Sequence, residues 1–421
     1  SLLITLHRRG IVSIDEIYAE ARGNAQLDMN DLPDLEDDNV QVAERWDALE
    51  REFIRRATVE QASKNLTPEQ IDDLVLLTRK REEAQSLEEI ASLSTLSFRL
   101  LADGVKRFCR LPRGQSRLSE QESLAARVAL IRHFISDQLE FIGIAKSYLT
   151  IRHFDDLVDR IVGDDSGLGR IGGKAAGMLL ANAILEKTRE DDPSAPDIPI
   201  AMPESFYLRA DVMEEYLRHQ GLLELQNQKY KSPEEVRNDY SMLLQVFKNA
   251  DFPQKITDQM RNKLEEIGEV PLIVRSSSLL EDRFGATFAG KYRSVFVANQ
   301  GPLEQRLADL MGAVAEVYAS TLHPDPISYR QRHNLLDYDE KMGVMVQKVV
   351  GTRCGDYFLP VWAGVAFSRN DYRRNPRIRP EDGLARLVVG LGTRAVDRTG
   401  DDYPRMMALG QPTLRELVKP Q

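Results

Sequence analysis

The sequence contains two segments whose residue types can bind anions, and the first of them is rich in glycine. From Gly167 to Gly177 it reads G-L-G-R-I-G-G-K-A-A-G, with Lys174 directly after Gly172 and Gly173. A helix is expected from 175 to 185, so Lys174 lies at its first turn. Free backbone N–H groups and an ammonium then converge where a phosphate can bind. A plain glycine turn with a solvated lysine is the alternative, because glycine is common at helix ends.

Two known nucleotide motifs match this segment only in part. The glycines from Gly167 to Gly172 fit the dinucleotide pattern G-x-G-x-x-G, which must follow a strand. Residues 154–161 instead carry apolar residues at helical spacing. A P-loop does not fit either, because Leu168 stands where that motif needs glycine and Ala175 replaces the Ser/Thr that holds magnesium. The pattern therefore disfavours a dinucleotide-dependent oxidoreductase.

The second segment is a short apolar strand, predicted from Leu272 to Val274, that ends in Arg275 and the serines Ser276 to Ser278. A guanidinium at a strand end can bind phosphate oxygens with two nitrogens at once, and the serine hydroxyls add donors. The alternative is a surface turn in which Arg275 forms an ion pair with a nearby acid, Glu281 or Asp282.

A glycine-rich stretch, F-G-A-T-F-A-G from Phe284 to Gly290, follows the serines. Small residues such as Gly285, Ala286 and Gly290 allow a backbone loop to approach a polyphosphate closely. Thr287 adds a hydroxyl donor. This stretch is therefore a second candidate for phosphate binding.

The order of the expected elements suggests two domains. Thr67 to Gln70 combines an N-cap residue, proline at the first helical position and glutamine three residues after the cap. Apolar residues between Ser119 and Leu149 recur every three or four positions, which predicts one long amphipathic helix. Beyond Gly163, short β-rich runs alternate with helices. We therefore expect a helical domain over 1–150 and an α/β (α+β) domain over 151–421.

Further strands are predicted in the second domain. Val344–Val350 and Val361–Ser368 flank a connection that contains Gly351 and Gly355, which suggests an antiparallel pair. Apolar residues at helical spacing from Leu303 to Tyr318 predict a helix between the strands.

The composition restricts the class of protein. Of 421 residues, 42% are hydrophobic and 29% charged, as in an ordinary globular protein of two or three domains. No apolar run approaches the roughly 18 residues of a membrane span. The two cysteines, Cys109 and Cys354, have no metal-type spacing, which favours reduced thiols and a cytoplasmic location. The net charge of −10 makes nucleic acid an improbable partner, although Tyr372 to Arg379 is basic.

Taken together, these motifs resemble the ATP-binding domain of phosphoenolpyruvate synthases and pyruvate phosphate dikinases. The resemblance covers residues 163 to about 410 and excludes residues 1 to about 150. Six segments agree in order: G-G-K-A-A-G-M at Gly172, V-R-S-S-S-L-L-E-D-R-F-G-A-T-F-A-G-K-Y at Val274, S-T-L-H-P-D-P-I-S-Y-R ending at Arg330, G-V-M-V-Q-K-V-V at Gly343, A-G-V-A-F-S-R-N at Ala363 and G-L-G at Gly390.

The resemblance implies an ATP-grasp-like fold and an activity. Members of the family pass a phosphoryl group from Mg-ATP to a histidine on a mobile domain, and then to pyruvate or another acceptor. By residue-for-residue matching, Lys174 and Arg275 would hold the ATP phosphates and carry the catalytic charge. Gly285 to Gly290 would cover the polyphosphate, and Gln347 would lie near the adenine. Gly172, Gly173 and Ser276 complete the implied nucleotide site.

The sequence also departs from the family pattern. Neither the D-x-E strand that supplies magnesium ligands nor the Q-x-R-P element is found before Gln421, and Thr393 and Arg394 follow G-L-G where relatives often have an acid. None of the six histidines has the small-residue context of a phosphohistidine. We therefore expect the chain to be part of a longer polypeptide whose further C-terminal domains supply the magnesium ligands and the histidine. A nucleotide-binding sensor or scaffold without catalysis, with a helical partner-binding region, stays open as the alternative.

Overall fold

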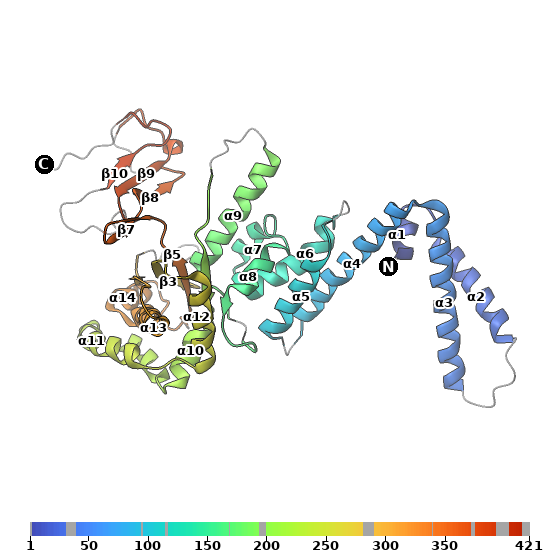
Figure 1. Cartoon of the computed structure of the whole chain (residues 1–421), viewed down its shortest axis with the longest axis horizontal. Helices are drawn as coiled ribbons and strands as arrows, with labels where there is room; N and C mark the ends of the chain where they lie inside the picture. Colours follow the sequence, from blue (N-terminus) through green and yellow to red (C-terminus); the bar gives the residue numbers. More distant parts are fainter. Residues whose placement is uncertain are drawn as a thin grey trace. The chain divides into compact units, whose positions relative to one another are not determined.

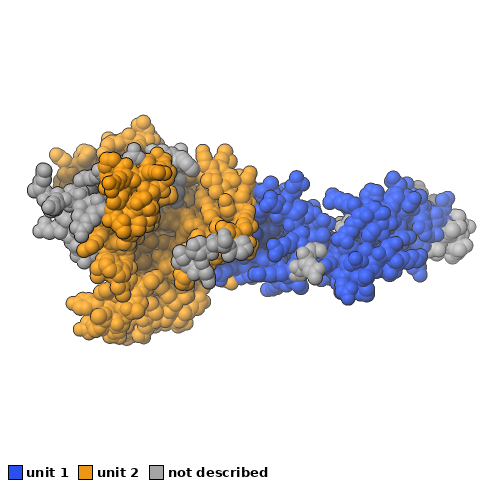
Figure 2. Space-filling model, turned by 90° about the horizontal axis from the view of Figure 1, so that it is seen from above, with its two compact units in different colours: residues 1–130, 149–156 blue, residues 131–148, 157–421 orange. Residues whose placement is uncertain are grey.

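The computed structural model describes residues 2–30, 39–93, 96–113, 117–167, 169–192, 199–280, 290–338, 340–371, 375–392 and 404–414. The chain forms two compact units, coloured separately in Figure 2. The first comprises residues 1–130 and 149–156, and the second comprises 131–148 and 157–421. The chain thus passes between the units more than once, and the single boundary near residue 150 stays a prediction.

The described residues of the first unit form helices joined by loops (Figure 1). Leucines make up much of its buried interior, and Leu74, Leu87 and Leu101 are fully buried. Leu74 also packs with Leu6 and Ala62 in a small cluster. The helices of this unit are α1 Leu2–Arg8, α2 Ile14–Asn30, α3 Asn39–Asn65, α4 Pro68–Ala91, α5 Phe98–Arg110 and α6 Glu120–Leu130, with α8 His153–Asp159 beginning in it.

The start of α4 confirms the capping pattern expected from the sequence. The Thr67 side chain accepts a hydrogen bond from the Gln70 backbone N–H, and the Gln70 side chain accepts one from the Thr67 N–H. Pro68 occupies the first turn, where its missing N–H costs nothing. Two otherwise unpaired donors are satisfied, which fixes where α4 begins.

The single long helix expected between residues 119 and 149 is wrong. The chain forms α6, then a π-helical turn, η1 Ile131–Ile135, and after a break the short helix α7 Leu139–Ala145. The Ser136 N–H reaches back to the Ile131 carbonyl, which is the wide π-type hydrogen bond. Because no helix continues past this turn, the Phe134 carbonyl accepts a hydrogen bond from the backbone N–H of Ile171 at 3.0 Å.

The second unit contains a five-stranded sheet with the strand order β1-β2-β5-β3-β4. Only β1 and β2 are parallel, and the other neighbours are antiparallel. The strands are β1 Ile161–Val162, β2 Ser205–Leu208, β3 Leu272–Ser278, β4 Ser294–Val297 and β5 Met342–Lys348.

One face of this sheet is covered by the main hydrophobic core. Paired residues share a face, so Leu272 and Val274 of β3 lie beside Val346 of β5 and pack with Val314 and Tyr318 of α13. The helices that contribute to this core are α10 Ala210–His219, α11 Pro233–Asn249, α12 Gln254–Ile267 and α13 Leu303–Ala319. The opposite face meets α9 Gly173–Asp191, which is the helix expected after Lys174.

The expected pairing of residues 344–350 with 361–368 is wrong. β5 lies between β2 and β3, whereas β8 Trp362–Phe367 pairs with β9 Leu384–Val389 in a separate three-stranded sheet completed by β10 Arg405–Met407. The turn at Gly355 instead joins a small hairpin, β6 Thr352–Cys354 with β7 Tyr357–Leu359. β5 is buried along almost its full length, so it belongs inside a sheet with a neighbour on each side.

Helix and sheet are therefore mixed in this chain, as the expected α/β class requires. The remaining short helices of the second unit are η2 Leu223–Tyr230, η3 Ser320–Leu322, α14 Pro324–Arg332 and η4 Pro380–Asp382. Among the helices of the described ranges, none has an apolar stretch long enough to span a lipid bilayer.

The cap of α4 gives a direct test of the first unit. Replacing Thr67 by Ala should lower the free energy of unfolding by about 1 kcal/mol, because the Gln70 N–H loses its acceptor. Urea unfolding followed by circular dichroism measures the change. Thr67→Ser keeps the hydroxyl and serves as the control. An equal loss for both substitutions would contradict the capping role.

Candidate functional site

The turn that precedes α9 lies very close to the ends of β3 and β5. Gly172 is the N-cap of α9 with φ +84° and ψ 173°, a conformation that is essentially restricted to glycine. A Cβ at this position would lie 1.5 Å from the Ser277 carbonyl oxygen. At Gly343 of β5, a Cβ would lie 2.8 Å from the Ile171 carbonyl oxygen. Both glycines are therefore required by the contact between the turn and the two strands.

Lys174 is bound to the serines of β3, which follow it by about a hundred residues in the sequence. Its ammonium donates to the Ser276 hydroxyl at 2.8 Å and to the Ser276 carbonyl at 3.1 Å. The Ala175 N–H donates to the Ser277 hydroxyl at 3.2 Å. Ser276 and Ser277 are fully buried, whereas Lys174 is half-buried. The two segments predicted to bind anions thus meet in the fold.

Arg275 lies inside β3 and not at its end, because the strand continues to Ser278. It is paired with Met345 of β5 on one side and Ser294 of β4 on the other. The expectation of a guanidinium at a strand terminus was therefore wrong. Arg275 shares its face of the sheet with Ser277, whose hydroxyl binds α9. The Arg275 side chain therefore leaves β3 on the sheet face that meets α9, the helix that has Lys174 in its first turn.

Gln347 lies on the same face, diagonally across from Arg275. It pairs directly with Ile273 on β3, two residues before the arginine. Its amide nitrogen donates to the Ser205 hydroxyl at 3.1 Å and approaches the Met178 sulfur of α9 at 3.4 Å. Gln347 is buried, so these contacts fix its side chain between β2 and α9.

Three residues that the resemblance assigns to the site, Gly285, Ala286 and Thr287, lie outside the described residues. Thr393 and Arg394, where the sequence departs from the family pattern, lie outside them as well. Gly290 is described: it is exposed and has φ +72°, which favours glycine there. Gly173 is buried as the first residue of α9.

The first part of the glycine segment has a different role, which the sequence did not reveal. Arg209 is fully buried and donates to the carbonyls of Gly167 at 2.9 Å and Asp164 at 2.6 Å. Asp211 accepts a hydrogen bond from the Gly169 N–H at 3.0 Å. A Cβ at Gly169 would lie 2.2 Å from the Asp211 carboxylate. The only signal in the sequence was an arginine that directly follows an apolar strand.

These contacts also explain why the dinucleotide pattern is misleading. The short strand β1 does precede the glycines, contrary to the expectation from residues 154–161. However, the side chains of Arg209 and Asp211 fill the space that a dinucleotide would need beside Gly167 and Gly169. Gly167 and Gly169 therefore allow the chain to pack closely against these two side chains.

Acidic and basic side chains meet beside this part of the segment, since Asp164 and Asp211 are paired with Lys255 and Arg209. Hydrogen bonds from Lys255 and then Ser166 hold the pKa of Asp164 far below its usual range. Burial, followed by the charges of Asp164 and Asp211, raises the pKa of Glu215. The charges of Asp164 and Asp211 thus disfavour a further negative charge at Glu215.

The described residues fit an anion better than a metal ion. The Lys174 ammonium lies beside the Ser276 hydroxyl, and the Ser277 hydroxyl binds the next residue of α9, a set of groups that suits an anion better than a cation. Within the described part of the chain, no group of three His, Cys, Asp or Glu side chains could hold a metal.

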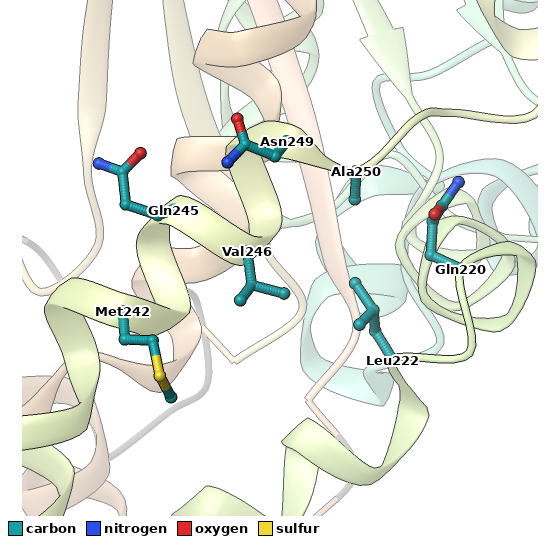
Figure 3. A pocket seen from close by; sticks show the side chains of 7 residues that line it. All are labelled: Gln220, Leu222, Met242, Gln245, Val246, Asn249 and Ala250. Carbon is teal, nitrogen blue, oxygen red and sulfur yellow. The ribbon is translucent and has the colours of Figure 1, made fainter.

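A separate hollow of about 370 Å³ lies on the second unit, between α11 and the connection from α10 to η2 (Figure 3). Its lining contains amide and apolar side chains but no charged group, and it shares no residue with the predicted site. The lining residues are Gln220, Leu222, Met242, Gln245, Val246, Asn249 and Ala250.

Comparison with known proteins shows which class of domain carries this glycine turn, lysine and pair of buried serines. Residues 168–421 match the family described as "Pyruvate phosphate dikinase, AMP/ATP-binding domain". The chain belongs to this family, as the motifs predicted. It is similar to phosphoenolpyruvate synthase of Deinococcus radiodurans, with 28% identity over 201 residues. The match covers 45% of this chain and 24% of that relative, so the chain corresponds to a minor part of the relative's length.

The Gly172 turn yields a test with an internal control. Gly172→Ala should lower the free energy of unfolding by at least about 1–3 kcal/mol from backbone strain, and the contact with Ser277 adds to this loss. Gly177→Ala, in the same helix with open space around its Cβ, should be neutral or stabilise by about 0.5–1 kcal/mol. Chemical denaturation of both variants measures the difference. Equal stabilities would contradict the close approach of the turn to β3.

Proposed function

We propose that the second unit binds Mg-ATP, with Lys174 and Arg275 holding the phosphates, and that it starts a phosphoryl relay in the complete protein. The observation that carries the proposal is the contact of the Lys174 ammonium with Ser276, the residue next to Arg275. It brings the Lys174 ammonium and the start of α9 to β3, beside the residue that follows Arg275 in the strand. Membership of the AMP/ATP-binding family supports a nucleotide as the anion.

The chemistry follows from these charges. Phosphoryl transfer needs mainly a fixed position and neutralisation of the charge on the phosphate oxygens. The Ser276 hydrogen bonds limit the rotamers of Lys174, so little order must be imposed on it when ATP binds. Arg275 can bind two oxygens at once. We further propose an ATP-grasp-like arrangement in which Gly172 and Gly173 face the phosphates and Gly285 to Gly290 cover them.

The adenine and magnesium are assigned less directly. Gln347 lies on the same sheet face as Arg275, opposite Ile273 on the neighbouring strand, and we propose that it lies toward the adenine. Magnesium would reach the site as Mg-ATP, bound to phosphate oxygens. We assign it no protein ligand among the described residues, in which no group of three acidic, histidine or cysteine side chains could hold a metal ion.

In the complete protein, the phosphoryl group would pass to a histidine on another domain and then to pyruvate or a different acceptor. The relative is named a phosphoenolpyruvate synthase, which supports pyruvate as the first acceptor to test. Nucleotide binding without transfer, as in a sensor or scaffold, is the competing function.

Calorimetric titration of Mg-ATP tests the site. Lys174→Ala and Arg275→Ala should each weaken binding about 10-fold or more, because each removes a charge-assisted hydrogen bond worth about 1.5–3 kcal/mol. Lys187→Ala, on the same helix but bound to the Ser147 carbonyl, is the matched control and should bind like the parent. Unchanged binding by both site variants would rule out the proposed phosphate site.

The relay needs a separate experiment on the longest natural polypeptide that contains this sequence. After incubation with radiolabelled ATP, a label on a histidine would support the relay. Tight binding without any labelled histidine would favour the sensor.

A further inference from the structure

A buried carboxylate, that of Glu340, joins the two places where the chain leaves β3 and returns toward β4. The Ser278 hydroxyl, at the last residue of β3, donates to one oxygen of Glu340. The Tyr292 hydroxyl, two residues before β4, donates to the other oxygen at 2.9 Å. Glu340 itself lies two residues before β5, so three chain segments meet at one carboxylate.

The environment of Glu340 is almost closed to solvent. Its side chain is 6% exposed, Ser278 is fully buried, and Tyr292 is 7% exposed. Arg330 of α14, also buried, lies with a terminal nitrogen 3.6 Å from the Glu340 oxygen that Tyr292 binds. A second Arg330 nitrogen donates to the Thr321 carbonyl at 3.3 Å. The negative charge is thus compensated inside the protein.

A buried ion pair of this kind is a poor source of stability. Removing two charges from water is costly, and well-packed apolar residues often stabilise a fold as well or better. What a carboxylate adds is geometry, since its two oxygens can each accept a hydrogen bond from a different segment. Here those segments are the two sides of the sequence that contains Gly285 to Gly290.

We propose that Glu340 is a positioning residue for the nucleotide site. Through Ser278 it fixes the end of β3, and Ser276, two residues earlier, binds Lys174. Through Tyr292 it fixes the chain directly after Gly290. The inference rests on the proposed ATP site and adds to it a residue that touches no nucleotide.

The test uses Tyr292→Phe, which removes one hydroxyl and leaves the ring, the buried charge pair and Ser278 in place. The matched control is Tyr216→Phe, because the Tyr216 hydroxyl also donates a buried hydrogen bond, to the Phe247 carbonyl, in the same unit. Two quantities are measured for each variant and for the parent: the affinity for Mg-ATP by calorimetry, and amide hydrogen exchange without nucleotide in peptides from 276 to 294.

We expect Tyr292→Phe to weaken Mg-ATP binding about 10-fold and to speed exchange in these peptides, whereas Tyr216→Phe changes neither. If both variants bind Mg-ATP equally more weakly than the parent, the loss reflects general destabilisation, and the proposal is overturned. Unchanged affinity and exchange in Tyr292→Phe would overturn it as well.

The exchange measurement separates this inference from the proposed function. If the parent binds no Mg-ATP, the proposed nucleotide site fails, while the exchange data still decide the role of Glu340. If exchange is then faster in Tyr292→Phe but not in Tyr216→Phe, the result supports Glu340 as the residue that fixes both segments. Unchanged exchange in Tyr292→Phe would exclude this role of Glu340.

Discussion

The turn before α9 can reach the end of β3 only because residue 172 has no side chain. With a Cβ 1.5 Å from the Ser277 carbonyl, any other residue would push the turn away from the strand. The contact of Lys174 with Ser276 and that of the Ala175 N–H with Ser277 both depend on this short separation. One missing side chain thus sets the position of the only lysine that the family resemblance assigns to phosphate.

β3 changes character halfway along its length. Leu272 and Val274 pack in the hydrophobic core, whereas Ser276, Ser277 and Ser278 are equally buried but polar. Buried hydroxyls are costly unless they form hydrogen bonds. Each of the three has a different partner: the Lys174 ammonium, the backbone of α9 and the Glu340 carboxylate. The polar half of one strand therefore organises a helix, a lysine and a buried charge pair.

Local patterns in the sequence predicted the local structure well. The capping box at Thr67 and the helix after Lys174 are present, since both depend on neighbouring residues only. Contacts between distant residues were harder to predict. Sequence spacing cannot show that Arg209 fills the space beside Gly167, or that β5 lies between β2 and β3. Helical periodicity likewise does not reveal that the helix ends after Ile135, where the Phe134 carbonyl has a distant partner, the Ile171 N–H.

That partner has a consequence for how the protein can be divided. The match to the nucleotide-binding family begins at residue 168, yet the Ile171 N–H is bound to the Phe134 carbonyl, and Arg170 binds the carbonyl of Arg132. A fragment that begins at the family boundary would leave those donors, three and four residues before Lys174, without their acceptors. Residues 131–148 thus fold as part of the second unit, and any recombination or grafting of the nucleotide-binding domain would have to include them.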